Sequence, residues 1–379
     1  MILFFLLGVL IVGVLWMLYY RWQWDKEIVV KLWFASAYVY AGQETKFYEV
    51  IENRKAVPVP VMEVRFRTKK ELDFSNADNT IVSDYIYKRD IFAILGRQKI
   101  TREIPVKCTK RGRYTISDAE ISTHSLLYGK RYSKGIETDA EIYVYPRMTD
   151  VSEIKTVCEQ LLGTLQCAKR LYEDPFAFRT IRSYTTDDPM KAINWKASAK
   201  TGSLMVNTYD SVQSQKAMLF LDVEDVGIIK REELVEESIA MAATLVRKLL
   251  RQNIEVGFAY NGAGQIMMPT NRKSALTELE RMLAEYDPEA GNQDFEQLVR
   301  ELFTGALSKK PLSQDTLLIF ITKNLNQQLM NCIGDCGGAY QTLVVVPVYR
   351  SEKAVQKDCI NAIKRKDNVQ VLVKEVAGG

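Results

Sequence analysis

The first 20 residues contain no charged side chain, and this run constrains the chain more than any other feature. A helix of 20 residues spans about 30 Å, the thickness of the hydrocarbon core of a bilayer. An aromatic and basic cluster suited to the headgroup layer closes the run: Trp16, Tyr19, Tyr20, Arg21, Trp22 and Trp24. We therefore expect a transmembrane anchor over residues 1–24.

A secretory signal peptide is the alternative interpretation of this run. It would have a charged segment before the apolar residues and a small-x-small cleavage site after them, and the sequence has neither. Basic residues follow the run at Arg21, Lys26 and Lys31, partly offset by Asp25 and Glu27. The positive-inside rule then predicts a single-pass protein of the cell membrane with its soluble part in the cytoplasm.

The amino-acid composition excludes several classes of catalytic site and of binding partner. The 379 residues include one histidine, His124, which excludes His-rich zinc sites and most Ser-His-Asp or Cys-His nucleophiles not built around it. The 51 basic and 47 acidic residues form no dense basic stripe, so we expect no nucleic-acid partner. Of six scattered cysteines, only Cys332 and Cys336 are close enough to suggest a pair. We expect free thiols in a reducing compartment, and no cofactor.

Residues 25–148 contain short β-type runs separated by turn residues, at 28–32, 46–51, 59–66, 113–116 and 141–145. This spacing predicts an antiparallel β-sandwich-like domain. Residues 149–215 change character, because apolar residues recur at helical spacing from Ile154 to Leu165 and a polar, Asp- and Thr-rich stretch follows. There we expect a short helix over residues 189–199, capped by Asp188.

Residues 216–379 alternate strands and helices. Apolar, β-rich runs occupy residues 217–223, 254–259, 316–322, 342–348 and 369–376. The clearest helix covers residues 231–252, with one face buried along the stripe Leu234, Ser238, Met241, Leu245 and Leu249 and the other face solvated. The pattern predicts a parallel sheet covered on both faces, a Rossmann-like α/β domain, so the chain as a whole is an α+β multidomain protein. Such sheets bind ligands at the carboxyl edge of their strands.

Acidic residues follow the first of these strands, at Asp222, Glu224 and Asp225. The stretch lacks the spaced glycines and the lysine of nucleotide-binding loops. Clustered oxygen ligands at a strand end are one way to hold a divalent metal. The alternative is an acidic loop that opens the next helix, where negative charge is favourable.

Two adjacent carboxylates, Asp187 and Asp188, lie in the polar stretch. Neighbours in sequence cannot be assumed to face each other across a substrate as acid and base. We favour loop carboxylates paired with Arg179, Arg182 or Lys191 over a catalytic pair. Tyr184 and Trp195 are expected to be buried anchors, since large aromatics supply much packing area.

Residues 182–206 hold an ordered set of Arg, Tyr, Asp, Ile, Trp, Ser and Ala: Arg182, Tyr184, Asp188, Ile193, Trp195, Ser198 and Ala199. In type and register this set resembles the motif of a bacterial family known as domain of unknown function 58. Asp187 stands where that family has Gly, and Lys191 and Lys200 stand where it has Arg.

The resemblance implies a membrane-anchored N-terminal part, a β-rich domain ending near Tyr145, the motif segment over residues 149–215, and a C-terminal domain similar to the von Willebrand factor A fold. Metal-binding domains of that fold have Asp-x-Ser-x-Ser after the first strand and a later Asp. Here the first motif reads Asp222-x-Glu224-x-Val226, and Thr322 is followed by Lys323, whose ammonium would repel a divalent cation. The resemblance thus implies a degenerate metal site at Asp222, Glu224 and Thr322.

The resemblance also implies partners, namely MoxR-type AAA+ ATPases and transglutaminase-like membrane proteins. We therefore expect a membrane-anchored, non-enzymatic adaptor or assembly factor with no catalytic residue, whose A-like domain binds a partner protein. In it Asp188 would pair with Arg182 or Lys191, and a buried Trp195 would hold the motif on the α/β domain. The family-motif residues, structural or interface in role, are then Arg182, Tyr184, Asp188, Lys191, Trp195 and Ser198.

Two rival functions stay open at this point. One is a cell-envelope enzyme that uses Asp187, Asp188 or a cysteine as its catalytic group. The other is an extracellular adhesion module, which requires the opposite membrane topology.

Overall fold

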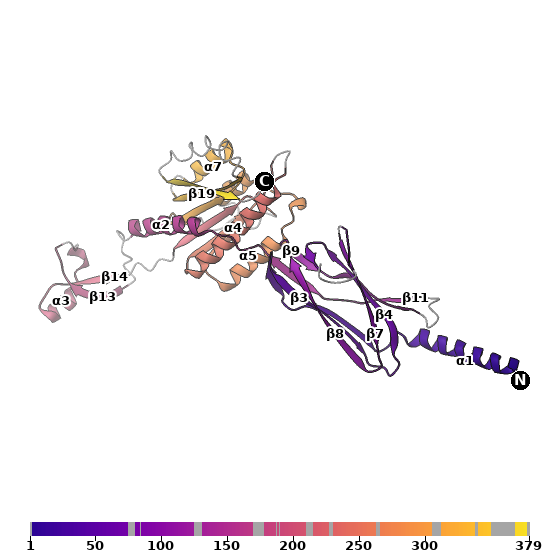
Figure 1. Cartoon of the computed structure of the whole chain (residues 1–379). Helices are drawn as coiled ribbons and strands as arrows, with labels where there is room; N and C mark the ends of the chain where they lie inside the picture. The colour runs from indigo at the N-terminus through magenta and orange to yellow at the C-terminus, as the bar shows by residue number, and fades with distance from the viewer. Residues whose placement is uncertain are drawn as a thin grey trace. The chain divides into compact units, whose positions relative to one another are not determined.

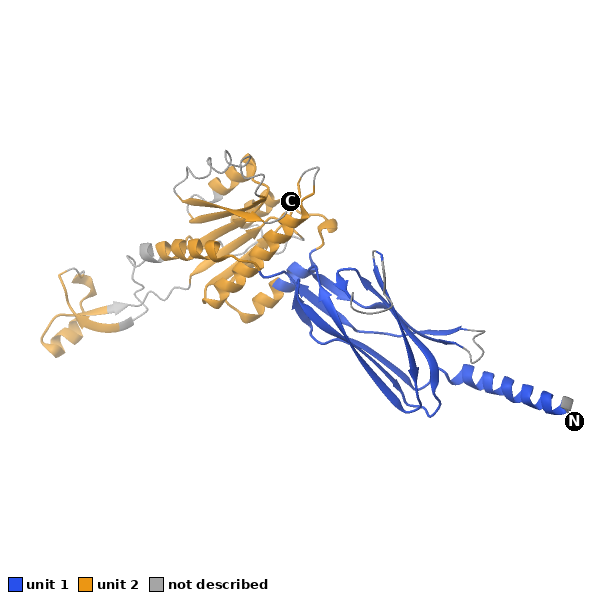
Figure 2. Ribbon diagram, in the orientation of Figure 1, with its two compact units in different colours: residues 1–148, 280–286 blue, residues 149–279, 287–379 orange. Residues whose placement is uncertain are grey.

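The computed structural model describes residues 2–74, 80–83, 85–124, 131–169, 178–186, 188, 190–209, 215–226, 230–262, 266–304, 312–337, 340–349 and 368–376. The chain divides into two compact units (Figure 2). Unit 1 comprises residues 1–148 and 280–286, and unit 2 comprises residues 149–279 and 287–379. The boundary at residue 148 coincides with the expected end of the β-rich domain. The apolar N-terminal helix, expected as a separate part, belongs to unit 1.

Helix α1 (Ile2–Gln23) is apolar and exposed along most of its length (Figure 1). Its segment Phe4–Gln23, with a mean hydropathy of 1.9, is long and apolar enough to cross a membrane. The end of the helix is different, because Tyr20 and the following Trp24 are only 6% exposed and pack in the core of unit 1. Lys55 Nζ donates to the carbonyls of Gln23 and Trp24 at 2.7 and 2.6 Å, which satisfies acceptors at the helix terminus.

Two antiparallel sheets form most of the described part of unit 1. The first has the order β1 (Ile28–Phe34), β3 (Glu44–Asn53), β8 (Gln98–Cys108), β5 (Leu72–Asp73). The second has the order β11 (Arg131–Gly135), β10 (Ser117–His124), β4 (Val59–Lys69), β7 (Tyr85–Ile94), β6 (Thr80–Val82). A third sheet joins β2 (Tyr38–Tyr40), β12 (Glu141–Tyr145) and β9 (Gly112–Thr115). In it β2 and β12 are parallel, so the expectation of a purely antiparallel domain is wrong at this pair.

The strands of unit 1 alternate buried and exposed residues, as on β7, because successive side chains of a strand point to opposite faces. The buried residues form two hydrophobic clusters, one including Phe47 and the other Ile51. Between these two positions on β3 lies Glu49, which is 1% exposed. On β7, Lys88 and Asp90 are also buried. A belt of ionisable side chains therefore crosses the interior of unit 1.

Unit 2 contains a six-stranded sheet: β17 (Ile266–Thr270), β16 (Glu255–Tyr260), β15 (Lys216–Leu221), β18 (Thr316–Ile321), β19 (Thr342–Tyr349), β20 (Val369–Val376). All neighbouring strands are parallel except β17, which runs antiparallel to β16 at the edge. In chain order the strands read 3-2-1-4-5-6, the doubly wound arrangement. Helices α2 (Ser152–Lys169), α4 (Glu232–Arg251), α6 (Phe295–Phe303) and α7 (Gln327–Gly337) belong to unit 2, with a short turn η2 (Pro288–Ala290). Helix α5 (Lys273–Glu285) begins in unit 2, and its residues from 280 onward belong to unit 1.

Helix α4 is buried on more than the expected stripe. The stripe from Leu234 to Leu249 is buried as expected, but 14 residues of this 20-residue helix are buried, so the prediction of a solvated opposite face is wrong. Helix α2 packs against α4, and Thr149 Oγ1 donates to Glu237 Oε1 at 2.7 Å. Helix α4 therefore packs against both the sheet and α2.

Candidate functional site

The family-motif residues lie in a small hairpin, residues 178–209, which we call the motif hairpin. Strands β13 (Phe178–Ser183) and β14 (Met205–Tyr209) pair antiparallel, and a turn η1 (Met190–Ala192) and helix α3 (Trp195–Thr201) connect them. Ser198 joins helix to strand, since its Oγ donates to Asn194 O and accepts from Met205 N, both at 2.8 Å. Ser198 is thus a structural residue of the hairpin.

Arg182 and Asp188 form the expected ion pair. Arg182 Nη1 and Nη2 donate to the two Asp188 oxygens at 2.7 and 2.5 Å, and Thr185 donates to Asp188 Oδ2 from its backbone N and its Oγ1. The guanidinium and the two Thr185 donors hold the pKa of Asp188 well below its usual range. The Asp188 side chain is 12% exposed but that of Arg182 is 44% exposed. The pair is therefore a surface ion pair that holds the loop after β13 against that strand.

Asp188 is not the helix cap. Asn194 caps α3, with its side chain accepting from Ala197 N at 3.0 Å, and the helix begins at Trp195 instead of near residue 189. The carboxylate of Asp188 is instead engaged by Arg182 and Thr185. Asp187, the other proposed catalytic carboxylate, lies outside the described residues.

Trp195 is exposed, which corrects the expectation of a buried anchor. Its exposed fraction is 67%, whereas Tyr184 is half-buried and Lys191 is exposed. The buried positions of the motif hairpin are taken by Ile193, Val206 and Ser198, so the indole lies outside this small core. Two more apolar residues of the hairpin are exposed, Met190 at 71% and Leu204 at 45%.

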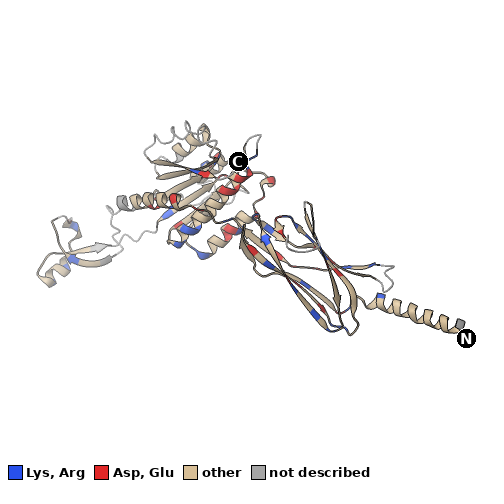
Figure 3. Ribbon diagram, viewed as in Figure 1, with Lys and Arg blue, Asp and Glu red and all other residues tan. Residues whose placement is uncertain are grey.

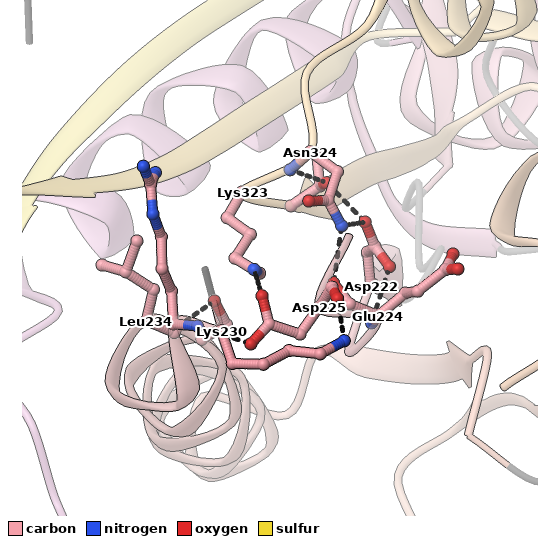
Figure 4. A network of polar contacts seen from close by, with 10 residues as sticks. Asp222, Glu224, Asp225, Lys230, Leu234, Lys323 and Asn324 are labelled. Atoms are coloured by element: carbon pink, nitrogen blue, oxygen red, sulfur yellow. Dashed lines mark hydrogen bonds and ion pairs between the residues drawn. The ribbon is translucent and has the colours of Figure 1, made fainter. Parts of the chain in front are cut away.

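The second expected site lies at the carboxyl edge of the sheet, where Asp222 follows β15 (Figure 4). Asp222 Oδ1 accepts from Asn261 Nδ2 at 2.9 Å and from Glu224 N at 3.0 Å. Asp222 Oδ2 accepts from Thr322 Oγ1 at 2.7 Å and from Asn324 Nδ2 at 3.0 Å. The edge between β15 and β18 is where the crossovers of this sheet diverge, the usual ligand position in such folds.

Asp222 has no acceptor capacity left. An ionised carboxylate offers about four lone-pair positions, and four protein donors occupy them. Asp222 is 3% exposed, so these donors replace the water that it loses on burial. In this arrangement the carboxylate is a structural hub that ties the ends of three neighbouring strands together.

The other acidic residues of the loop have separate roles. Glu224 contributes its backbone carbonyl, which accepts from Asn324 Nδ2 at 2.6 Å. Partial burial and the nearby Asp222 and Asp294 raise the pKa of its carboxyl group. Asp225 forms an ion pair with Lys323 and accepts from Arg231 N at 2.6 Å, at the start of α4. Of the two interpretations of this loop, the geometry therefore fits the acidic loop that opens a helix.

The structure brings Asp222, Glu224 and Thr322 together as expected, and it adds Asn261 and Asn324. Neither asparagine was predicted from the sequence. Each follows the end of a strand by one or three residues, as Asn261 follows β16 and Asn324 follows β18. An amide just beyond a buried strand is a signal that could have placed them at the same edge.

Residues 180–361 match the profile of a family described as "Protein of unknown function DUF58". This part of the chain belongs to the DUF58 family. The matched region includes the motif hairpin from residue 180 onward and most of the six-stranded sheet, so the DUF58 assignment covers both candidate sites. No curated protein matches the sequence.

Solved structures give only weak likenesses. A CARDB domain from Pyrococcus furiosus is 12% identical, with 31% of this chain and 91% of that one covered and a TM-score of 0.21. A non-cellulosomal cohesin from Archaeoglobus fulgidus is 14% identical, with 34% and 96% covered and a TM-score of 0.20. A GH20 exo-β-N-acetylglucosaminidase from Vibrio harveyi is 9% identical, with 86% and 82% covered and a TM-score of 0.25. At such TM-scores these likenesses carry no argument.

Proposed function

We propose that this DUF58 protein is a membrane-anchored, non-enzymatic adaptor or assembly factor that binds a partner protein. A MoxR-type AAA+ ATPase is the partner class that the family resemblance implies, with a transglutaminase-like membrane protein as a second member of the complex. The observation that carries the proposal is the exposure of Trp195, because a 67% exposed indole in the family motif is available for a protein contact.

Burial at the end of α1 supports a retained anchor. Tyr20 and Trp24 belong to a hydrophobic cluster of unit 1, and Tyr20 Oη lies 3.2 Å from Thr123 Oγ1. Cleavage after a signal sequence would remove Tyr20 from this core. The packing of Tyr20 therefore favours a retained membrane anchor over a cleaved signal peptide.

Strand order supports a von Willebrand factor A-like sheet in unit 2. The 3-2-1-4-5-6 order with an antiparallel third strand, and an Asp directly after the first strand, fit that fold. The saturated carboxylate of Asp222 supports a sheet edge that serves structure and partner binding instead of ion-dependent chemistry.

Orientation of the soluble units toward the cytoplasm is part of the proposal. Cys108 and Cys158 are free and buried, which is compatible with a reducing compartment. Reporter fusions at the C-terminus test this directly. Activity of a cytoplasmic reporter is expected, and activity of a reporter that works only outside the membrane would support the adhesion module.

The partner is tested by affinity purification of the full chain from native membranes in mild detergent. We expect an AAA+ ATPase to co-elute with the parent chain in near-stoichiometric amount. Repeated purification without any ATPase would contradict the adaptor proposal. A turnover assay on the same preparation tests the rival enzyme, which would require activity that Asp188→Asn abolishes.

A further inference from the structure

The end of α1 fixes where unit 1 begins relative to the apolar stretch. Leu18 and Tyr19 are 54% and 45% exposed, and the next residue, Tyr20, is buried in unit 1. A helix rises 1.5 Å per residue, so these exposed apolar side chains lie within two residues, or about 3 Å along the axis, of a residue buried in the folded unit. No linker intervenes between them.

The headgroup region of a bilayer is thin. A hydrocarbon core of about 30 Å within a total of about 40–45 Å leaves roughly 5–7 Å on each side. If Leu18 and Tyr19 face lipid, the residues of unit 1 that surround Gln23 lie within that layer, since Gln23 is about 6 Å farther along the helix axis than Tyr19.

Two turns of unit 1 lie beside Gln23. Lys55, between β3 and β4, donates to the carbonyl of Gln23, and its own carbonyl accepts from Arg97 N at 2.9 Å. Arg97 lies in the β7–β8 turn, together with Leu95, which is 66% exposed. On α1 itself Trp22 is 64% exposed. We call Trp22, Lys26, Leu95 and Arg97 the membrane-proximal surface.

The chemistry of this surface fits a lipid headgroup layer. Lys26 Nζ lies 3.0 Å from the centre of the Trp22 ring, which joins a cation to an interfacial aromatic residue. Basic residues outnumber acidic ones around the junction: Arg21, Lys26, Arg54, Lys55, Arg97 and Lys134 against Asp25, Glu27 and Glu52. Figure 3 shows that α1 is otherwise free of charged residues, Arg21 in its last turn being the exception.

We infer that the membrane-proximal surface of unit 1 sits in the headgroup layer of an anionic leaflet, with Leu95 and Trp22 inserted and Lys26 and Arg97 on lipid phosphates. The inference rests on the proposed anchor and goes beyond it, because an anchor alone allows the soluble part to stand away from the bilayer. Because Tyr20 at the end of α1 is buried in the core of unit 1, the fold itself holds the membrane-proximal surface at the bilayer.

The test uses the full chain in vesicles of phosphatidylcholine, with or without phosphatidylglycerol, and a fluorescent amino acid in place of Leu95, Lys70 or Val12. Spin-labelled lipids then quench the probe from the headgroup or from the acyl chains. Position 70 is the control, because it lies at the Cys108 end of β8, about 33 Å from Gln98. Position 12 reports on the anchor itself.

We expect headgroup labels to quench the probe at residue 95 at least twofold more than the probe at residue 70, and acyl-chain labels to quench the probe at residue 12. Phosphatidylglycerol should increase quenching at residue 95, and the double variant Lys26→Glu, Arg97→Glu should cancel that increase. Equal quenching at residues 95 and 70 with residue 12 quenched would overturn the seating alone. An unquenched residue 12 would overturn the anchor as well, and no response to phosphatidylglycerol would overturn the anionic preference.

Discussion

The side-chain amide of Asn324 lies 3.0 Å from Asp222 Oδ2 and 2.6 Å from the carbonyl oxygen of Glu224. One neutral donor thus joins two groups that would both be ligands if this sheet edge held a cation. Thr322, Asn261 and the backbone N of Glu224 complete the set of donors around the carboxylate. At this edge, hydrogen bonds join the residues that follow strands β15, β16 and β18.

Asn324→Leu should therefore destabilise the chain. The substitution removes a donor from a buried carboxylate, and an unsatisfied buried polar group costs about 1–3 kcal/mol. Urea unfolding of the full chain in mild detergent measures the effect. Asn331→Leu, at an exposed position of α7, is the matched control and should change stability little. Equal stability of the two variants would contradict the role given to Asn324.

Divalent cations should not stabilise the protein. A cation at 100 times its dissociation constant would add about 2.7 kcal/mol to the free energy of unfolding. We expect no rise in melting temperature with Mg²⁺, Mn²⁺ or Ca²⁺, because Asp222 has no lone pair to offer. A rise that Asp222→Asn abolishes would show that the hydrogen-bonded arrangement opens to admit an ion.

Because Trp22 is exposed and Trp24 is buried, we expect substitutions of these two tryptophans to change the free energy of unfolding by different amounts. Trp24→Ala should destabilise unit 1 by about 3–5 kcal/mol, because Trp24 is 6% exposed in a hydrophobic cluster. Trp22→Ala should have little effect on unfolding, because Trp22 is 64% exposed. Urea unfolding of both variants in detergent is the measurement. Equal, small effects would mean that α1 is not part of the fold of unit 1.

Glu49 predicts a pH dependence of stability. Burial, with Asp90 adding to it and Lys88 and Arg102 opposing it, raises the pKa of Glu49 from its usual 4.5 to about 8. Neither carboxyl oxygen has a hydrogen-bond partner among the described residues. Between about pH 4.5 and pH 8 the folded chain holds a proton that the unfolded chain releases, so this group's contribution to stability falls as pH rises through that window.

Glu49→Gln should remove this dependence. Relative to the parent chain, the variant should gain on the order of 2–4 kcal/mol between pH 5 and pH 9. Urea midpoints at pH 5, 7 and 9 provide the comparison. Glu103→Gln, on an exposed residue of β8, should leave the pH profile of the parent unchanged in that window. Parallel profiles for the parent and Glu49→Gln would mean that Glu49 is ionised in the folded chain.

Local pattern placed the parallel strands of the six-stranded sheet, but in unit 1 the named runs did not include long strands such as β7 and β8. Residues 317–321 are continuously apolar, and β18 is buried along its whole length. Strand β17 was not predicted from the sequence. It contains Pro269, and proline is typical of an edge strand, where β17 lies. Its pairing with β16 is a contact between segments, which local sequence pattern does not reveal.

The candidate sites depended on information that local pattern does not hold. The Asp222 network joins residues about 40 and 100 positions apart, and the strand order decides which strand ends meet. The Arg182–Asp188 pair is local and was anticipated. The exposure of Trp195 was not anticipated, because it depends on whether the core of the motif hairpin has room for an indole.

The most direct test of the adaptor proposal compares two tryptophans on the parent chain. Trp195 lies in the motif hairpin and Trp33, 40% exposed on β1, is the matched control in unit 1. The measurement is the amount of AAA+ ATPase recovered with the full chain, purified in mild detergent, for Trp195→Ala, Trp33→Ala and the parent. The account predicts at least a tenfold loss for Trp195→Ala and recovery near the parent level for Trp33→Ala. Full recovery with Trp195→Ala, or an equal loss with both variants, would contradict it.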